Sequence, residues 1–117
     1  MHVSKNKLND NLKKEIIKTF IQTLDDLKDT KEKEVFLKDF FNDQEIETYA
    51  KRLAIAYWLK KKRSYENIKN NLKVSSATIA TVEKQMNTEG FKLALKKMEA
   101  EEWADVWTEK IKKVIIK

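Results

Sequence analysis

Apolar residues recur every three or four positions along residues 9–27 and form one face, which is typical of an amphipathic helix. The residues on and beside this face are Leu12, Ile16, Ile17, Phe20, Ile21, Leu24 and Leu27. After a polar break at residues 28–31, an aromatic-rich pattern at residues 35–41 predicts a shorter second helix. The N-terminal third of the chain is therefore expected to be a pair of helices.

A third helix is predicted from Asp43 to about Lys61. Asn42 and Glu45 have the reciprocal spacing of a capping box at its start. Residues 53–59 are seven apolar residues in a row, which on a helix point in every direction and require burial on all sides. We interpret this run as the centre of a homodimer, in which a partner's helices complete the burial. Central packing within a single bundle is the alternative.

Residues 64–86 have the spacing of a helix-turn-helix, in which two short helices meet at a fixed angle. The expected buried contacts are Ile68, Leu72, Val74, Ile79 and Val82. Ser64 can cap the first helix and Ser75 or Ser76 the second, because a serine hydroxyl accepts hydrogen bonds from free N–H groups at a helix start. Lys69 stands where a small residue is usual, and Lys73 where glycine commonly permits a left-handed turn.

The remaining C-terminal residues also follow helical spacing. Thr88 can cap a helix through residues 91–98, and residues 103–115 continue the pattern, with acids early and lysines late, as the helix dipole favours. The chain has one glycine and no proline, so signals for strands and tight turns are nearly absent. We predict an all-α bundle of about six helices.

The composition argues against catalysis. The chain has no cysteine, and its one histidine, His2, lies near the terminus, so the commonest nucleophile, general base and metal ligand are absent or poorly placed. Charges at this density usually form solvated helix faces. We therefore expect no enzyme activity, no cofactor and no metal site. With no apolar run long enough for a membrane span and no signal-peptide pattern, we expect a cytoplasmic protein.

The net charge of +6 is concentrated in one part of the sequence. Residues 51–84 hold nine lysines and arginines against two acids, so this segment carries +7 and the rest of the chain −1. A generic lysine-rich surface would spread its excess along the chain. The concentration favours binding to the phosphates of a nucleic acid.

The second helix of the 64–86 unit is the candidate reader of DNA bases. The residues expected at base edges are Ser76, Ala77, Thr78, Ala80 and Thr81. Lys69 and Lys73 would contact phosphates, Lys84 lies farther along, and Ser75 joins the interface unless its hydroxyl only caps the helix. The basic segment 60–63, which is Lys60, Lys61, Lys62 and Arg63, is a further predicted phosphate-contacting patch. Without a long bidentate reader, we expect modest sequence discrimination, aided by DNA shape and water.

Three runs of sequence resemble the Trp-repressor-like family, most closely its small YerC/YecD-type helix-turn-helix members. They are Ala-Lys-Arg-Leu-Ala-Ile-Ala from residue 50, Ser-Tyr-Glu-Asn-Ile-Lys-Asn-Asn-Leu from residue 64, and Val-Ser-Ser-Ala-Thr-Ile-Ala-Thr-Val from residue 74. The resemblance implies an intertwined homodimer whose paired helix-turn-helix units read a two-fold site on double-stranded DNA. It covers residues 10–98 in architecture and 42–86 in residues.

The resemblance extends only partly to ligand control. In the tryptophan-sensing repressor of this family, two arginines sandwich the indole and a glycine makes room for it. Arg52 matches the first arginine, but Thr81 stands at the second arginine position and Val82 at the glycine. Arg52 by itself is interpreted as an ordinary surface or interface arginine. We expect no response to tryptophan, and no other effector is indicated.

The sequence thus predicts a dimeric, sequence-specific regulator of transcription, as a repressor. Residues 1–98 would form the DNA-binding domain, and residues 99–117 a C-terminal helical extension. One alternative is a helical protein-interaction module that uses Trp103 and Trp107 as anchors, since aromatic residues are enriched at binding hot spots. Another is a duplex-DNA-binding domain that serves replication.

Overall fold

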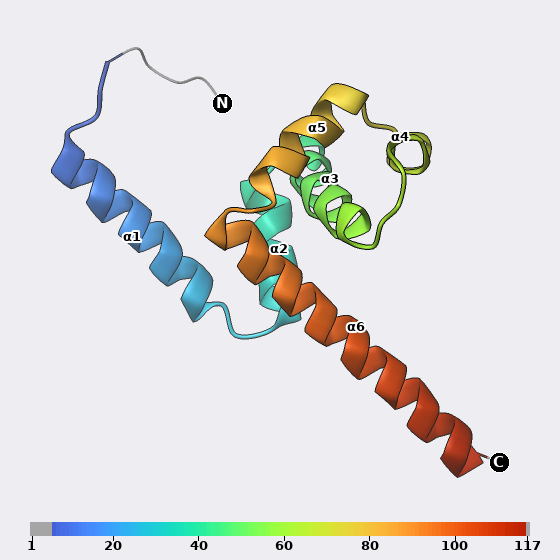
Figure 1. The fold of residues 1–117 in the computed structure, drawn as a ribbon. Helices are drawn as coiled ribbons and strands as arrows, with labels where there is room; N and C mark the ends of the chain where they lie inside the picture. Colours follow the sequence, from blue (N-terminus) through green and yellow to red (C-terminus); the bar gives the residue numbers. More distant parts are fainter. Residues whose placement is uncertain (1–5, 117) are drawn as a thin grey trace. The chain divides into compact units, whose positions relative to one another are not determined.

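The computed structural model describes the backbone of residues 6–116 and the side chains of residues 6–102. Over this range the chain forms six helices and no strand (Figure 1), which confirms the all-α prediction. The helices are α1 (Asp10–Asp26), α2 (Thr30–Phe40), α3 (Asp43–Lys60), α4 (Tyr65–Leu72), α5 (Ser76–Gln85) and α6 (Glu89–Ile116). They belong to two compact units, Met1–Asp43 and Gln44–Lys117, which are described separately.

The first unit is a pair of helices with side-chain caps at both starts. The Asn9 side chain accepts hydrogen bonds from the backbone N–H groups of Asn11 and Leu12, at 2.9 and 3.2 Å. Asp29 accepts from the N–H of Glu32 at 2.8 Å and so begins α2. Each cap satisfies donors that have no partner inside the helix.

Aromatic rings join the two helices of this unit. Phe20 of α1 makes edge contacts with Phe36 and Phe40 of α2, with ring centroids 6.4 and 5.5 Å apart. Phe36 and Phe40 stack on each other at 5.0 Å, and Phe41 meets Phe40 edge-on at 5.1 Å. Such pairs stabilise packing beyond their buried area.

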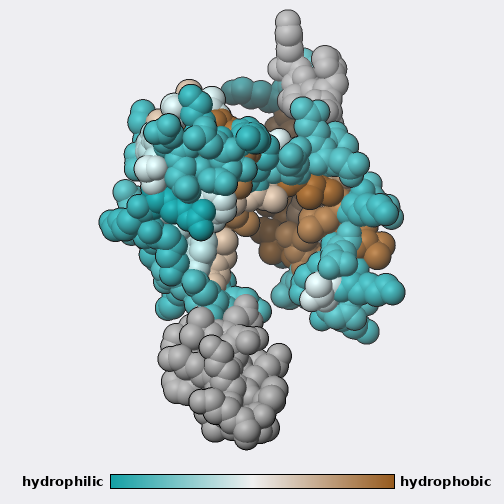
Figure 2. All heavy atoms as spheres, turned by 90° about the vertical axis from the view of Figure 1, so that its right-hand side faces the viewer, coloured by the Kyte–Doolittle hydropathy of each residue, from teal (hydrophilic) through white to brown (hydrophobic). Residues whose placement is uncertain are grey.

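The apolar stripe of this pair is nevertheless uncovered, because none of the described residues of α1 or α2 is buried. The exposed large apolar residues in and next to these helices are Leu8, Leu12, Ile16, Ile17, Phe20, Ile21, Leu24, Val35, Leu37 and Phe40. Figure 2 shows apolar side chains gathered in a broad patch on the visible surface. A contiguous apolar face of this kind marks an interaction surface.

The second unit holds the buried core. Its fully buried residues are Ile55, Ala56, Ile68, Ile79, Val82 and Leu95. Leu72 and Val74 pack against this core while partly buried, so all five positions expected for the helix-turn-helix contribute to it. Along residues 53–59, only Ile55 and Ala56 are buried, and Leu53 is 41% exposed. Tyr57, Trp58 and Leu59 are partly buried against the same core, so Leu53 is the one residue of that run that is exposed.

The turn between α4 and α5 follows the expected local chemistry. Ser64 accepts a hydrogen bond from the N–H of Asn67 at 3.1 Å and caps α4. Ser75, rather than Ser76, caps α5 by accepting from the N–H of Thr78 at 3.1 Å. Lys73 ends α4 with φ 56° and ψ 52°, the left-handed conformation in which glycine is usual.

The last helix is longer than the pattern suggested, since α6 runs without a break through residues 98 and 99. Thr88 precedes it as expected, but its hydroxyl donates backwards to the carbonyl of Gln85 at 2.7 Å. The side chains of Trp103 and Trp107 lie outside the described residues, and the assignment of residues 99–117 to a separate extension stays a prediction. In the described part of the chain, no helix combines the length and apolar character that a membrane span requires.

Candidate nucleic-acid interface

Helix α5 presents one polar face outward and one apolar face inward. Ile79 and Val82 point into the core, while Ala77, Thr78 and Thr81 are exposed at helical spacing. Of the other residues predicted at DNA, Ser75, Ser76 and Lys84 are exposed and Ala80 is half-buried; Lys69 of α4 and Lys73 of the turn are also exposed. The predicted reading face is thus available to a ligand.

The hydroxyl groups on this face already have internal partners. Ser75 Oγ and Thr78 Oγ1 lie 2.9 Å apart, and Thr81 Oγ1 donates to the carbonyl of Ala77 at 3.0 Å. Because a hydroxyl has one donor and two acceptor positions, each of these groups keeps at least one position for a further hydrogen bond. These contacts hold the side chains in defined orientations on the helix.

A cleft of about 640 Å³ lies beside the start of α5, and we call it the reading cleft. Its walls are residues 48–55 of α3, the turn after α4 and one side of α5 from Thr78 to Gln85. Lys51, Arg52 and Lys73 line it together with Ser75, Thr78 and Thr81, among other residues, and no acid is present among the described residues that do so. Cations together with hydroxyl groups suit a phosphate-bearing ligand.

Lys51 and Arg52 were not predicted to contact DNA. Lys51 forms an ion pair with Glu47 at 3.5 Å, one turn earlier on α3. Arg52 donates a hydrogen bond to Oε1 of Gln85 at 3.0 Å, and its guanidinium lies 5.6 Å from the centre of the Phe91 ring. The charge count over residues 51–84 was the available signal, but only the packing of α3 on α5 brings these two side chains to the cleft.

The basic segment 60–63 is exposed but largely engaged within the chain. Lys60 pairs with Glu99, and Lys61 with Glu102, each at 3.1 Å. The Arg63 guanidinium stacks 4.0 Å from the centre of the Trp58 ring and donates to Asn67 at 3.4 Å. Two of the four predicted phosphate-binding cations are therefore already paired with carboxylates.

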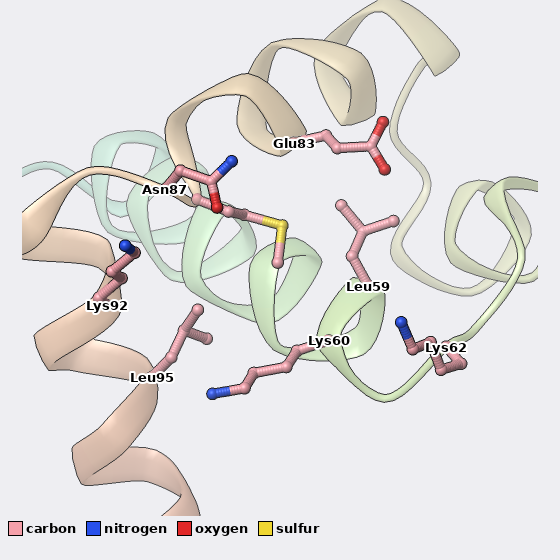
Figure 3. Close-up of a pocket in the computed structure, with 8 residues that line it drawn as sticks. Leu59, Lys60, Lys62, Glu83, Asn87, Lys92 and Leu95 are labelled. Atoms are coloured by element: carbon pink, nitrogen blue, oxygen red, sulfur yellow. The ribbon is translucent and has the colours of Figure 1, made fainter.

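A second cleft, of about 440 Å³, lies near the other end of α5, between the ends of α3 and α5 and the start of α6. Lys60, Lys62 and Lys92 line it, together with Glu83 (Figure 3). Lys62 is the other residue besides Lys73 with a left-handed backbone among the described non-glycine residues, at φ 66°. The structure thus places Lys51 and Lys73 at the reading cleft, and it places Lys60, Lys62 and Lys92 at the second cleft.

One contact across the helix-turn-helix was not anticipated. The Tyr65 hydroxyl, at the start of α4, donates to Glu83 of α5 at 2.6 Å. This hydrogen bond, with desolvation and the negative charge of Glu83, raises the pKa of Tyr65 above 10.0. Separately, the described residues contain no group of three or more His, Cys, Asp or Glu side chains that could hold a metal ion.

Comparison with known proteins now adds to this geometry. The family model described as Trp repressor protein matches residues 15–99. The chain belongs to the Trp repressor family. The crystal structure of a TrpR like protein from Eubacterium eligens ATCC 27750 is similar to this chain, with 27% sequence identity and a TM-score of 0.70. The similarity covers 78% of this chain and 96% of that one, whereas no curated protein shows a significant match.

Membership of the Trp repressor family confirms the resemblance seen in the sequence, and this is a family of helix-turn-helix DNA-binding regulators. Val82, which the resemblance places at the indole-clearing glycine, is 1% exposed and part of the core, and it also lines the reading cleft. Thr81, at the second arginine position, lines the reading cleft. Residues beyond 99 lie outside the matched family region.

Proposed function

We propose that this protein is a cytoplasmic, homodimeric regulator that binds double-stranded DNA sequence-specifically and acts as a repressor of transcription. The observation that carries the proposal is the reading cleft. Three cations from two different segments surround the exposed hydroxyl groups at the start of α5, with no acid among the described lining residues. The cations would attract phosphates of any sequence, and the hydroxyl groups beside them would discriminate between bases.

In the proposed complex, the start of α5 enters the major groove and α4 crosses the DNA backbone. Thr78, Thr81 and Ala77 would meet base edges through hydroxyl and methyl groups. Lys69, Lys73 and the two cations of α3 would contact phosphates on either side. Because none of the base-facing residues makes a bidentate contact, part of the discrimination would come from DNA shape and bridging water.

The uncovered apolar surface supports the homodimer. The described residues of α1 and α2 leave their apolar stripe exposed, and Leu53 of α3 is exposed as well. A second copy of the chain would bury these groups, as the family resemblance implies. Two reading helices related by a two-fold axis would then meet half-sites about 34–36 Å apart. A dimer that covers a promoter in this way would exclude other proteins from it.

We propose further that tryptophan is not the effector. By the family resemblance, Val82 stands where the tryptophan sensor has a glycine, and Thr81 where it has the second stacking arginine. Arg52, the remaining match, is hydrogen-bonded to Gln85. An indole would lack one of its two stacking partners.

The decisive experiment is selection of bound sites from random duplex DNA, followed by a salt titration on the selected site. A two-fold motif, bound with a steep salt dependence, is the expected result. Recovery of no motif, with equal affinity for all duplexes, would favour the replication alternative. Absence of duplex binding, combined with capture of a protein that is lost on replacing Trp103 and Trp107, would favour the interaction module.

A further inference from the structure

The ion pairs between α3 and α6 join the basic segment 60–63 to the C-terminal extension. Lys60 and Lys61 are consecutive at the end of α3, and their partners Glu99 and Glu102 are spaced one turn apart on α6. Figure 3 shows the Lys60 side chain extending toward α6. The two pairs therefore form a matched set between the helices.

All four side chains stay accessible to solvent, at 40–48% exposure. An exposed ion pair shifts an equilibrium by about fivefold at most, because water and salt screen it. A DNA phosphate offers the same anionic oxygen acceptors as a carboxylate and brings many charges at once. Glu99 and Glu102 can thus be displaced by DNA, but only at a cost in affinity.

The location of these lysines makes the competition relevant to DNA. The basic segment leads directly into Ser64, the cap of α4, which is the helix expected to cross the DNA backbone. Two of its four cations are neutralised locally by carboxylates of α6. The family match ends at residue 99, so Glu102 is supplied by the part of the chain beyond the matched region.

We propose that Glu99 and Glu102 compete with DNA phosphates for Lys60 and Lys61, so that the start of the C-terminal extension weakens DNA binding by the domain to which it is attached. This inference rests on the proposed DNA-binding function and adds a built-in regulation of it. The carboxylates set the number of cations that are free to release counterions from DNA. Their effect is a limit on affinity rather than a block.

The test compares isosteric charge-neutral variants of the full-length protein on one random-sequence duplex across a range of salt concentrations. Glu99→Gln/Glu102→Gln is expected to bind about three- to twentyfold more tightly at low salt. Its salt slope should steepen by up to about two units, one for each freed lysine. Glu101→Gln is the matched control, because Glu101 is exposed on the same turn and neutralising it removes one negative charge without freeing a lysine. It should change affinity by about twofold at most and leave the slope unchanged.

A double-mutant cycle separates direct competition for the two lysines from a general effect of the protein's net charge. Lys60→Ala/Lys61→Ala should alter the salt slope little in the wild-type background. In the Glu99→Gln/Glu102→Gln background, it should reduce the slope by about two units. Equal effects in both backgrounds, or a Glu99→Gln/Glu102→Gln slope no steeper than that of Glu101→Gln, would overturn the inference. If the wild-type protein binds no duplex at any salt concentration, the proposed function itself fails.

Discussion

The hydroxyl of Tyr65 and the carboxylate of Glu83, eighteen residues apart in the chain, are joined by a 2.6 Å hydrogen bond that links the first turn of α4 to α5. Glu83 is one of only two acids in the strongly basic stretch 51–84. Its position on α5, the helix proposed to read DNA, is explained by this contact, which helps to fix the angle between the two helices. The contact also affects the pKa of Tyr65, which can be measured.

Tyr65 should ionise above its ordinary pKa of 10.0, because the hydrogen bond to Glu83, desolvation and the negative charge of Glu83 all favour the protonated phenol. A raised pKa means that this contribution to stability is complete below about pH 10 and is lost as the pH rises through the raised value. The difference in absorbance at 295 nm between wild type and Tyr65→Phe isolates this titration. In Glu83→Gln the step should move to lower pH. A wild-type step at or below pH 10 would contradict the assignment.

Replacing Lys73 by glycine should separate backbone strain from charge. The left-handed backbone at φ 56° is costly for lysine and free for glycine, so Lys73→Gly should raise the free energy of unfolding by up to about 1 kcal/mol. Lys73→Ala keeps the strain and should show no such gain. Both variants should bind all duplexes more weakly, with the salt slope reduced by about one unit. Wild-type affinity in Lys73→Gly would remove Lys73 from the interface.

Thr78 should carry sequence discrimination. Thr78→Val keeps the shape of the side chain but loses the hydroxyl, and should cost about 1–3 kcal/mol on the selected site and much less on random DNA. Thr78→Ser, which keeps the hydroxyl and loses the methyl group, distinguishes a hydrogen bond from a contact with a thymine methyl. Lys69→Ala should instead weaken binding to every duplex and leave selectivity intact. The reverse pattern would mean that the proposed orientation of α5 is wrong.

The protein should have twice the mass of one chain at micromolar concentration, as measured by light scattering. Ile21 of α1 is 61% exposed in the single chain, so Ile21→Glu should shift the protein toward a monomer without disturbing the buried core of residues 44–117. Lys18→Gln makes the same change in charge at an exposed polar position of α1 and should leave the mass unchanged. A wild-type monomer would refute the dimer.

Calorimetry with L-tryptophan should give no stoichiometric heat. Thr81→Arg restores the second stacking arginine but should not restore binding, because a branched valine still stands where a glycine is expected. A tight one-to-one signal with the wild-type protein would show that the pocket rearranges around the ligand.

The sequence was most informative about features that depend on near neighbours. The caps at Ser64 and Ser75 and the left-handed turn at Lys73 depend on residues a few positions apart, and the buried positions of the helix-turn-helix follow the apolar spacing of two short helices. Local propensity and apolar spacing determine these features, so they can be predicted from the order of residues in the sequence. The choice between Ser75 and Ser76 needed the structure, because either hydroxyl could have served.

The arrangement of charges around the site could not be predicted in the same way. Lys51 and Arg52 reach the cleft beside Lys73 because α3 packs on α5, and Lys60 meets Glu99 because the end of α3 lies near α6. These partners lie more than twenty residues apart. The periodicity of a sequence does not indicate where a long, flexible side chain places its charged group. A count of charge along the sequence therefore located the basic region but not which of its cations are free.

The left-handed lysines at positions 62 and 73 also bear on how this protein could change over time. Asparagine tolerates that backbone better than most residues, and its codons differ from those of lysine by a single nucleotide. Drift toward asparagine would thus keep both turns while discarding both charges. Persistence of lysine at either position among natural variants would be the mark of selection on the ammonium group itself, and the two positions can be judged independently.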